Sequence, residues 1–209
     1  MPGRYDAVLF DLLTALLDSW TLWNRVTGDA ASGLRWRAEY LRITYAAARY
    51  RPYEDLVAEA AAAVGLSTRL AAELAERYIE LAPWPEAPAV LREIAAAGVP
   101  LGVVTNCSEA LGQVAAGRLG VSFRTVVTAE RAGFYKPDPR PYRLALDEIG
   151  VAAERALFVA GSAYDLFGAA RVGLKCWWHD RIGMDVPQGA PAPLARHRDL
   201  IPLAAAVLG

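Results

Sequence analysis

The first apolar segment of the chain, Val8-Leu9-Phe10, is followed directly by Asp11. A short run of such residues favours a buried β-strand, so Asp11 stands where that strand must end. A buried carboxylate is costly unless another group pairs it. In open α/β sheets, ligands bind at the carboxyl ends of parallel strands. Asp11 is therefore a candidate reactive group, and the alternative is that it caps the helix that follows.

Residues 16–84 carry a helical pattern, so the chain does not return at once to strand structure. Apolar residues at three- and four-residue spacing predict helices over 35–49, 53–64 and 67–81. The Pro-rich segment at 83–88 then ends the pattern. We therefore expect an all-helical cap inserted after the first strand.

From residue 85 onwards, short apolar segments alternate with helical ones. With the first strand included, the expected strands cover residues 5–10, 101–105, 125–128, 157–160 and 174–178. The expected helices cover 89–97, 108–119, 166–171 and 200–208, and another begins at Pro139. A surface loop is expected at 183–195. This alternation predicts an α/β fold with a doubly wound parallel sheet, a Rossmann-like core. The expected domains are a core of residues 1–15 and 85–209 and a helical cap of residues 16–84.

The amino-acid composition limits the kinds of protein that this chain can be. Of the 209 residues, 55% are hydrophobic and 22% charged, so the chain can bury a core. The net charge of −1 gives no reason to expect nucleic acid or a membrane surface as partner. Cys107 and Cys176 lack metal-type spacing and predict reduced thiols. With no signal-peptide pattern and no bilayer-spanning apolar run, we expect a cytoplasmic protein.

Further polar clusters follow the later strands. They are Thr105 and Asn106, then Lys136, then Ser162 and Asp165. Because a parallel sheet brings the carboxyl ends of its strands to one edge, these clusters are expected beside Asp11.

Together, the clustered residues predict a reactive carboxylate site. Asp11 can act as a nucleophile if it stays ionised, and Lys136 would lower its pKa by charge pairing. Thr105 and Asn106 offer hydrogen-bond donors, and Asp165 can position or deprotonate water. Each residue has a plainer alternative: Lys136 as a solvated loop residue, and the others as turn or helix caps.

Four of these segments resemble the motifs of the haloacid dehalogenase superfamily in order and spacing. They are Phe10-Asp11, Thr105-Asn106, the run from Tyr135 to Tyr142, and the run from Phe158 to Asp165. The resemblance covers nearly the whole chain, and a helical cap after the first motif matches the family's arrangement. The run beginning Lys136-Pro137-Asp138-Pro139-Arg140 is the most specific part and is most similar to the L-2-haloacid dehalogenase branch.

The resemblance implies a metal-independent hydrolase without a cofactor, acting on a small carboxylic acid. Asp11 would attack the halogen-bearing carbon of a 2-haloacid and form an ester. Lys136 would keep Asp11 ionised, and water positioned by Asp165 would hydrolyse the ester to a 2-hydroxy acid. Tyr142 and Ser162 would support Lys136 and the substrate carboxylate. The family resemblance also implies that a homodimer can form.

One further implied role lies in the predicted cap. Trp36-Arg37 is similar to a Trp-Arg pair of the dehalogenase branch, in which the Arg binds the departing halide. A permanently charged guanidinium suits that role. The alternative for Arg37 is a solvated helix face.

The chain also departs from the family patterns. Phosphatases of the superfamily carry acidic residues where this chain has Leu13 and Gly161, so a magnesium site lacks a ligand. Dehalogenases carry Tyr-Gly-Thr where this chain has Leu13-Thr14-Ala15, and Thr14 is the expected substitute contact. They carry Ser and Asn where this chain has Ala160 and Ser162. These departures leave three alternatives: a hydrolase that opens a strained ring or an epoxide, a magnesium-dependent phosphatase, and a catalytically degenerate binding protein.

Overall fold

The computed structural model describes residues 4–47 and 49–209. Its strands are β1 (Ala7–Phe10), β2 (Leu101–Thr105), β3 (Thr125–Thr128), β4 (Ala156–Ala160), β5 (Lys175–His179) and β6 (Ala195–His197). Its α-helices are α1 (Ser19–Thr27), α2 (Ala30–Ala47), α3 (Tyr53–Ala63), α4 (Arg69–Glu76), α5 (Ala87–Ala96), α6 (Glu109–Gly117), α7 (Ala129–Ala132), α8 (Pro139–Ile149), α9 (Asp165–Arg171) and α10 (Leu203–Leu208), with 3-10 turns η1 (Arg77–Glu80) and η2 (Ala153–Arg155).

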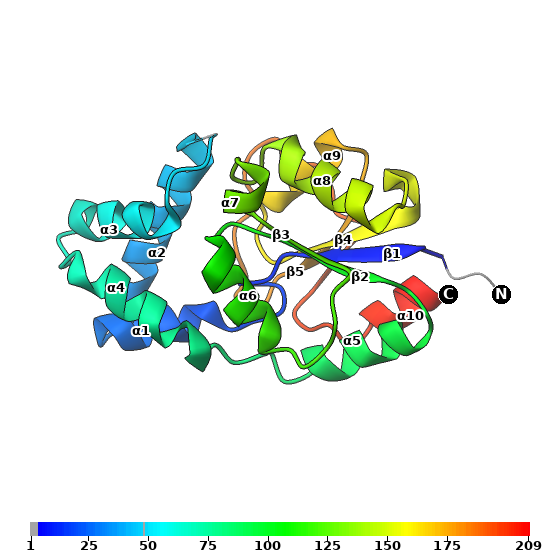
Figure 1. Ribbon diagram of the computed structural model, residues 1–209, viewed down its shortest axis with the longest axis horizontal. Helices are drawn as coiled ribbons and strands as arrows, with labels where there is room; N and C mark the ends of the chain where they lie inside the picture. Colours follow the sequence, from blue (N-terminus) through cyan, green and yellow to red (C-terminus); the bar gives the residue numbers. More distant parts are fainter. Residues whose placement is uncertain (1–3, 48) are drawn as a thin grey trace.

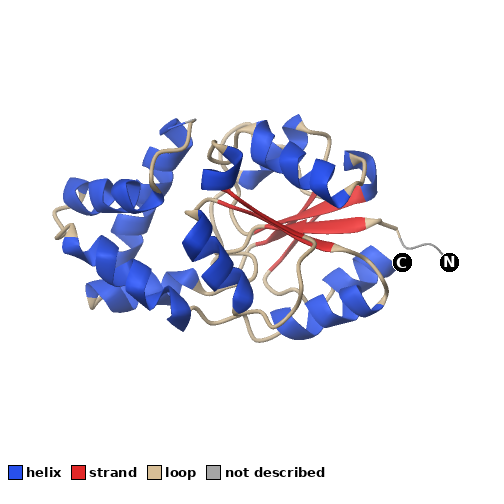
Figure 2. Cartoon of the chain, viewed as in Figure 1, coloured by secondary structure: helices blue, strands red, loops and turns tan. Residues whose placement is uncertain are grey.

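The strands form one six-stranded sheet in the order β3-β2-β1-β4-β5-β6, with every pair parallel. Helices α8 and α9 cover one face and α5 and α10 the other (Figures 1 and 2). The predicted doubly wound parallel sheet is therefore confirmed, and the five expected strands match within two residues at either end. The predicted end of the surface loop 183–195 is wrong, because Ala195 already belongs to β6, which pairs with β5.

The helices between β1 and α5 gather beyond the carboxyl ends of the strands (Figure 1). Trp23 packs against Trp36 with ring centres 4.5 Å apart, and the indole Nε1 of Trp36 donates to the Val57 carbonyl at 2.8 Å. Two chain segments connect these helices to the sheet, and they pair through an isolated antiparallel bridge between Leu17 and Pro83.

Several helix boundaries differ from the predicted ones; for example, the helix predicted over 200–208 begins only at Leu203. Helix α2 begins at Ala30 instead of residue 35, because the Asp29 carboxylate accepts the Ser32 N–H at 2.8 Å. Its predicted end at 49 is wrong, because α2 ends at Ala47 and Arg49 instead forms an isolated bridge with Phe134; residue 48 lies outside the described residues. The helix predicted over 67–81 becomes α4 followed by the 3-10 turn η1. Ser108 precedes α6, but its hydroxyl donates to Glu54 at 2.6 Å instead of capping the helix.

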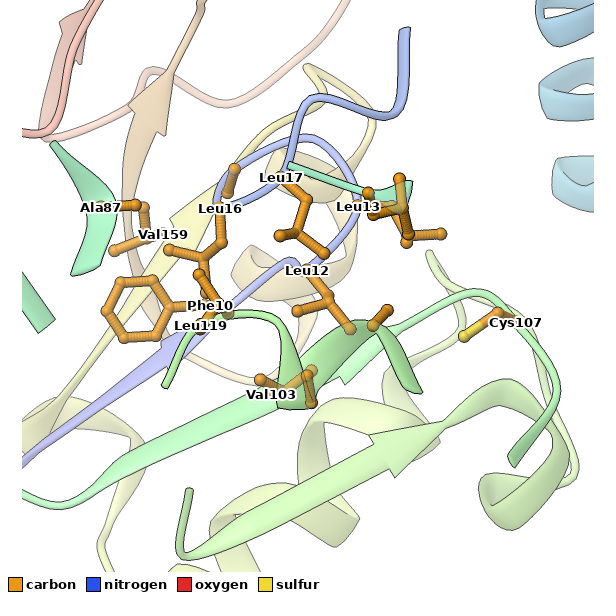
Figure 3. Close-up of a cluster of buried hydrophobic side chains, with 14 of the residues drawn as sticks. Phe10, Leu12, Leu13, Leu16, Leu17, Ala87, Val103, Cys107, Leu119 and Val159 are labelled. Carbon is orange, nitrogen blue, oxygen red and sulfur yellow. The ribbon is translucent and has the colours of Figure 1, made fainter. Parts of the chain in front are cut away.

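The segment after β1 is held in place by its leucines. Leu12, Leu16 and Leu17 are fully buried, and Figure 3 shows them gathered around Phe10 and Val103. Burying each such side chain contributes about 1.5–3 kcal/mol. This packing holds in position the loop that carries Asp11.

Within residues 4–47 and 49–209, no helix is both long enough and apolar enough to cross a membrane. Cys107 and Cys176 are both buried as free thiols. Burial raises the pKa of the Cys107 thiol to about 12, so it stays protonated at neutral pH.

We predict that Gly102→Ala lowers the free energy of unfolding by about 1–3 kcal/mol through overpacking. A Cβ at Gly102, in the middle of the sheet, would lie 2.6 Å from Leu9 Cδ2 and 3.0 Å from Thr125 Cγ2. The matched control is Gly117→Ala at the end of α6, where a Cβ meets nothing within 4 Å and alanine is the better helix former. Urea denaturation measures both variants; equal stability of the two would contradict the close approach at Gly102.

Candidate functional site

Asp11 lies immediately after β1 and is buried. Its Oδ2 accepts three hydrogen bonds from the following loop: from Thr14 N at 2.9 Å, from Thr14 Oγ1 at 2.6 Å and from Ala15 N at 3.1 Å. The alternative of a helix cap is wrong, since these donors belong to a loop and α1 is capped by Asp18. The hydrogen bonds from this loop therefore all go to Oδ2, and Oδ1 accepts none of them.

Lys136 meets that other oxygen. Its Nζ lies 2.8 Å from Asp11 Oδ1 and 3.0 Å from Asp165 Oδ1, and only 3% of the residue is exposed. The prediction that Lys136 pairs with Asp11 is confirmed, and the alternative of a solvated loop lysine is wrong. One ammonium therefore bridges two buried carboxylates that come from different strand ends.

The two carboxylates differ in acidity. Burial opposes ionisation of Asp11, but the Lys136 charge and the hydrogen bonds from Lys136 and Thr14 outweigh it, so the pKa of Asp11 is lowered. Burial raises the pKa of Asp165 to about 6, against the opposing charge of Lys136. Burial likewise disfavours the Lys136 cation, yet both carboxylates together raise its pKa. When environments separate two such pKa values, they also separate the roles: Asp11 stays an anion, and Asp165 can exchange a proton near neutral pH.

Asn106 and Thr105 differ from the expected substrate contacts. The Asn106 side chain donates Nδ2 to the Lys136 carbonyl at 3.1 Å and accepts the Lys136 N–H at 2.7 Å, so it positions the lysine backbone. Asn106 still lines the pocket described below. Thr105 does not line that pocket; it is buried under Cys107, whose Sγ lies 3.8 Å from Thr105 Oγ1.

Ser162 and Tyr142 flank Asp165 on two sides. The Tyr142 hydroxyl donates to Asp165 Oδ1 at 2.9 Å from behind, outside the pocket. Ser162 lines the pocket, and its hydroxyl lies 3.2 Å from the hydroxyl of Tyr45. Tyr45 lies in α2, so a phenol from the cap helices reaches the position next to Ser162 and Asp165.

Arg37 closes the pocket from the side of the cap helices. Only 4% of it is exposed, so the alternative of a solvated helix face is wrong. Its guanidinium carbon lies 4.1 Å from the ring centre of Trp20 and 5.5 Å from that of Trp23. Its buried Nε has no hydrogen-bond partner among the described residues. Burial lowers the pKa of Arg37, and the nearby Asp11 opposes that change.

The pocket between these groups has a volume of about 40 Å³. It is lined by Asp11, Leu13, Thr14, Trp20, Arg37, Tyr40, Leu41, Tyr45, Asn106, Lys136, Ser162, Asp165 and Met184. A single water molecule needs roughly 10–15 Å³ on this scale, so only a small ligand fits. The pocket presents an ionised carboxylate to that ligand, with cations on two sides.

The site does not suit a magnesium ion. A Cβ at Gly161 would collide with Thr14 and with the Ala15 nitrogen, so no acidic side chain fits there without moving the Asp11 loop. Leu13 adds no oxygen ligand. No group of three or more His, Cys, Asp or Glu side chains suited to a metal occurs in the part of the chain that the structure describes. Lys136 already occupies the space between the two carboxylates.

Sequence reasoning missed the groups that hold the Asp11 loop from behind. Its successive carbonyls are bound by Ser19 Oγ at Leu13, by Trp84 Nε1 at Thr14 (3.0 Å) and by His179 Nδ1 at Ala15 (2.7 Å). Because a carbonyl only accepts, the Nδ1 of His179 carries the proton. Burial lowers the pKa of His179, which keeps the ring neutral. The only signal for His179 was its position at the carboxyl end of a strand, where it is the last residue of β5; Trp84 and Ser19 carried none.

The fold and the site define a hydrolase-type α/β enzyme with a buried aspartate after its first strand. A profile of the haloacid dehalogenase-like hydrolase family matches residues 5–173, and the chain belongs to that family. The chain is 29% identical over 212 residues to (S)-2-haloacid dehalogenase H-109 of Pseudomonas putida, covering 93% of this chain and 94% of the relative.

Two other relatives agree. A further (S)-2-haloacid dehalogenase of Pseudomonas putida is 30% identical over 165 residues, covering 74% of this chain and 72% of that protein. The crystal structure of the L-2-haloacid dehalogenase RSc1362 superposes with a TM-score of 0.85 at 27% identity, covering 96% and 97% of the two chains. The family resemblance stated from the four motifs is confirmed.

We predict that Lys136→Met lowers the free energy of unfolding at pH 7.5 by about 3–5 kcal/mol, because two buried carboxylates lose their cation. Without the cation their pKa values rise above the unfolded values, so the folded state binds more protons. Its stability relative to the native protein therefore recovers as the pH falls toward 5. Chemical denaturation at both pH values measures this change.

The control for this variant is Arg155→Met, which breaks a surface ion pair with Asp6. Solvent screens that pair, so the variant should change stability far less. A Lys136→Met deficit that is the same at pH 7.5 and pH 5 would contradict the bridging role.

Proposed function

We propose that this protein is a metal-independent 2-haloacid dehalogenase that converts small L-2-haloacids to 2-hydroxy acids. The single observation that carries the proposal is the state of Asp11. It is ionised, it is oriented through Oδ2 by three donors, and it opens on a small pocket that holds Arg37. The (S)-2-haloacid dehalogenases among its relatives support the substrate class.

In the first proposed step, Asp11 Oδ1 attacks the halogen-bearing carbon, and the carbon–halogen bond breaks. Oδ1 is the attacking atom because Oδ2 is occupied by the Thr14 and Ala15 donors. The halide leaves toward Arg37, whose Nε has no partner among the described residues. The cation matches the charge that develops on the leaving group, which is where electrostatic catalysis is strongest. The product is an ester between Oδ1 and the substrate carbon.

In the second proposed step, water attacks the ester carbonyl carbon of Asp11. Asp165 accepts the proton, and its raised pKa of about 6 suits a general base near neutral pH. Negative charge then develops on Oδ2, where the N–H groups of Thr14 and Ala15 and the Thr14 hydroxyl form an oxyanion hole. The bond between the carbonyl carbon and Oδ1 then breaks, and Asp165 returns its proton to the departing Oδ1, which frees the 2-hydroxy acid. The water oxygen stays in the Asp11 carboxyl group, which loses its remaining proton to solvent. Thr14 therefore acts on Asp11, not as the substrate contact expected from the sequence.

Several broader features belong to the same proposal. Residues 16–84 act as a cap that supplies Arg37 and Tyr45, and residues 1–15 and 85–209 form the catalytic core. The protein works in the cytoplasm, which its two free buried thiols support. A homodimer remains the expectation drawn from the family. The metal-free geometry at Lys136 and Gly161 supports dehalogenation over phosphoryl transfer.

We predict that the native protein releases chloride from L-2-chloropropionate in the presence of a chelator, and that Asp11→Asn lowers kcat at least about a thousandfold because the nucleophile is lost. Ion chromatography measures the chloride. The matched control is Asp55→Asn in α3, an exposed carboxylate that forms no hydrogen bond or ion pair with the described residues, and it should retain full activity. Chloride release by Asp11→Asn at the native rate would overturn the covalent mechanism, and release by neither protein would point to another leaving group.

We predict that kcat falls below about pH 6, because protonated Asp165 cannot accept the water proton. Tyr142→Phe removes a hydrogen bond that lowers the Asp165 pKa, so this acid limb should move to higher pH by about one unit. Steady-state pH profiles measure the limb. Tyr5→Phe removes a buried hydroxyl that has no partner among the described residues, and should leave the limb in place. A shift to lower pH in Tyr142→Phe would contradict the role of Asp165.

A further inference from the structure

A second hollow lies directly beside the catalytic pocket. Its volume is about 490 Å³, against about 40 Å³ for the pocket itself. Leu34 and Ala38 of α2 form one wall, and Ile182 of the loop after β5 contributes to the rest. Leu34 is 55% exposed and Ile182 45%, so both present apolar surface to this open space. We name this hollow the apolar annex.

The annex and the catalytic pocket share a wall. Trp20, Leu41, Tyr45 and Met184 line both spaces. Tyr45 is fixed in that wall by Ser162 and by the ring of Tyr164, whose centre lies 4.3 Å away. A methionine side chain is flexible and unbranched, so Met184 can move aside more easily than its neighbours. A chain attached to a ligand in the pocket thus has a short route into the annex.

The charges around the annex indicate what it can hold. Two charged side chains line it among the described residues: Arg42, which Glu39 already binds through contacts of 2.6 and 2.8 Å, and Asp185, whose carboxylate disfavours an anionic ligand there. Two other cations, Arg37 and Lys136, line the catalytic pocket instead; Lys136 bridges Asp11 and Asp165, and the buried Nε of Arg37 has no partner among the described residues. The carboxylate of a substrate is therefore held in the pocket, and the annex suits an uncharged apolar chain.

We propose that the annex binds the hydrocarbon chain of longer 2-substituted carboxylic acids, so that medium-chain acids are the preferred substrates; this rests on the proposed function. The size of the annex agrees with those of ligand sites, whereas the pocket alone takes only a small acid. Full burial of each added methylene would increase affinity by about fourfold. A second copy of the chain is the competing occupant, and the tests below separate the two.

The first test measures binding without turnover. Isothermal titration of the intact protein with n-alkanoates from acetate to octanoate should show affinity rising by about two- to fourfold per methylene beyond propionate. Leu34→Glu places a charge in the annex and should remove most of this increase. The matched control Ile201→Glu changes an apolar side chain that is 69% exposed elsewhere and should keep the increase. Affinity that does not rise with length, or that rises equally in Leu34→Glu, overturns the proposal.

The second test uses turnover and separates the two proposals. The ratio of kcat/KM for L-2-chlorooctanoate over L-2-chloropropionate should exceed ten in the native protein and fall at least tenfold in Leu34→Glu. Turnover of chloropropionate without a length preference overturns the annex and leaves the proposed function standing. If no chloro acid reacts but alkanoate affinity still depends on length and on Leu34, the proposed function fails and the annex stands.

Light scattering on the same variants tests the competing occupant. If Leu34→Glu converts a native dimer to monomers while the chain-length preference persists, the hollow is a subunit interface and the proposal is wrong. An unchanged oligomeric state together with a lost length preference supports the annex.

Discussion

The bridge that Lys136 forms between Asp11 and Asp165 is the interaction on which the site depends. Two carboxylates buried this close repel each other, and a single ammonium at 2.8 and 3.0 Å makes their burial tolerable. The two carboxylates nevertheless differ in their surroundings, because Asp11 also accepts three hydrogen bonds from its own loop. Asp11 is thereby kept ionised, whereas Asp165 retains affinity for a proton near neutral pH. The proposed division of roles between Asp11 as nucleophile and Asp165 as base rests on this asymmetry.

The loop after β1 fixes the position of Asp11 within this arrangement of charges. Its leucines are buried in the core, and its carbonyls are bound by Ser19, Trp84 and His179. These three side chains hold the carbonyl groups of the loop, and the N–H groups of Thr14 and Ala15 point inward to Asp11. Gly161 approaches so closely that any side chain there would displace this loop. Trp84 stands between η1 and α5, where the helices that follow β1 connect back to the sheet, so the attachment of these helices is linked to the position of Asp11.

Much of this arrangement follows from local sequence signals. Apolar runs followed by Asp11, Asn106, Lys136 and Asp165 predict polar groups at strand ends, and parallel topology brings such ends together. Other features have no local signal. The three-residue strand β6 is too short to show an alternating pattern. Thr105 and Asn106 are neighbours in the sequence, yet only Asn106 lines the pocket. Tyr45 in α2 carries no local signal for a site residue, but its hydroxyl lies 3.2 Å from that of Ser162.

The sequence by itself determined the parallel sheet, the inserted helices and the four polar strand ends, because hydrophobic periodicity and strand-end position are local properties. The tertiary structure alone decided that Asp11 and Asp165 share one cation, that Arg37 is buried against Trp20, and that a large apolar annex adjoins a small charged pocket. These features depend on how helices from one part of the chain pack over strand ends from another. Burial and distance set the energies of such contacts, and neither can be read from residues that lie far apart in the sequence.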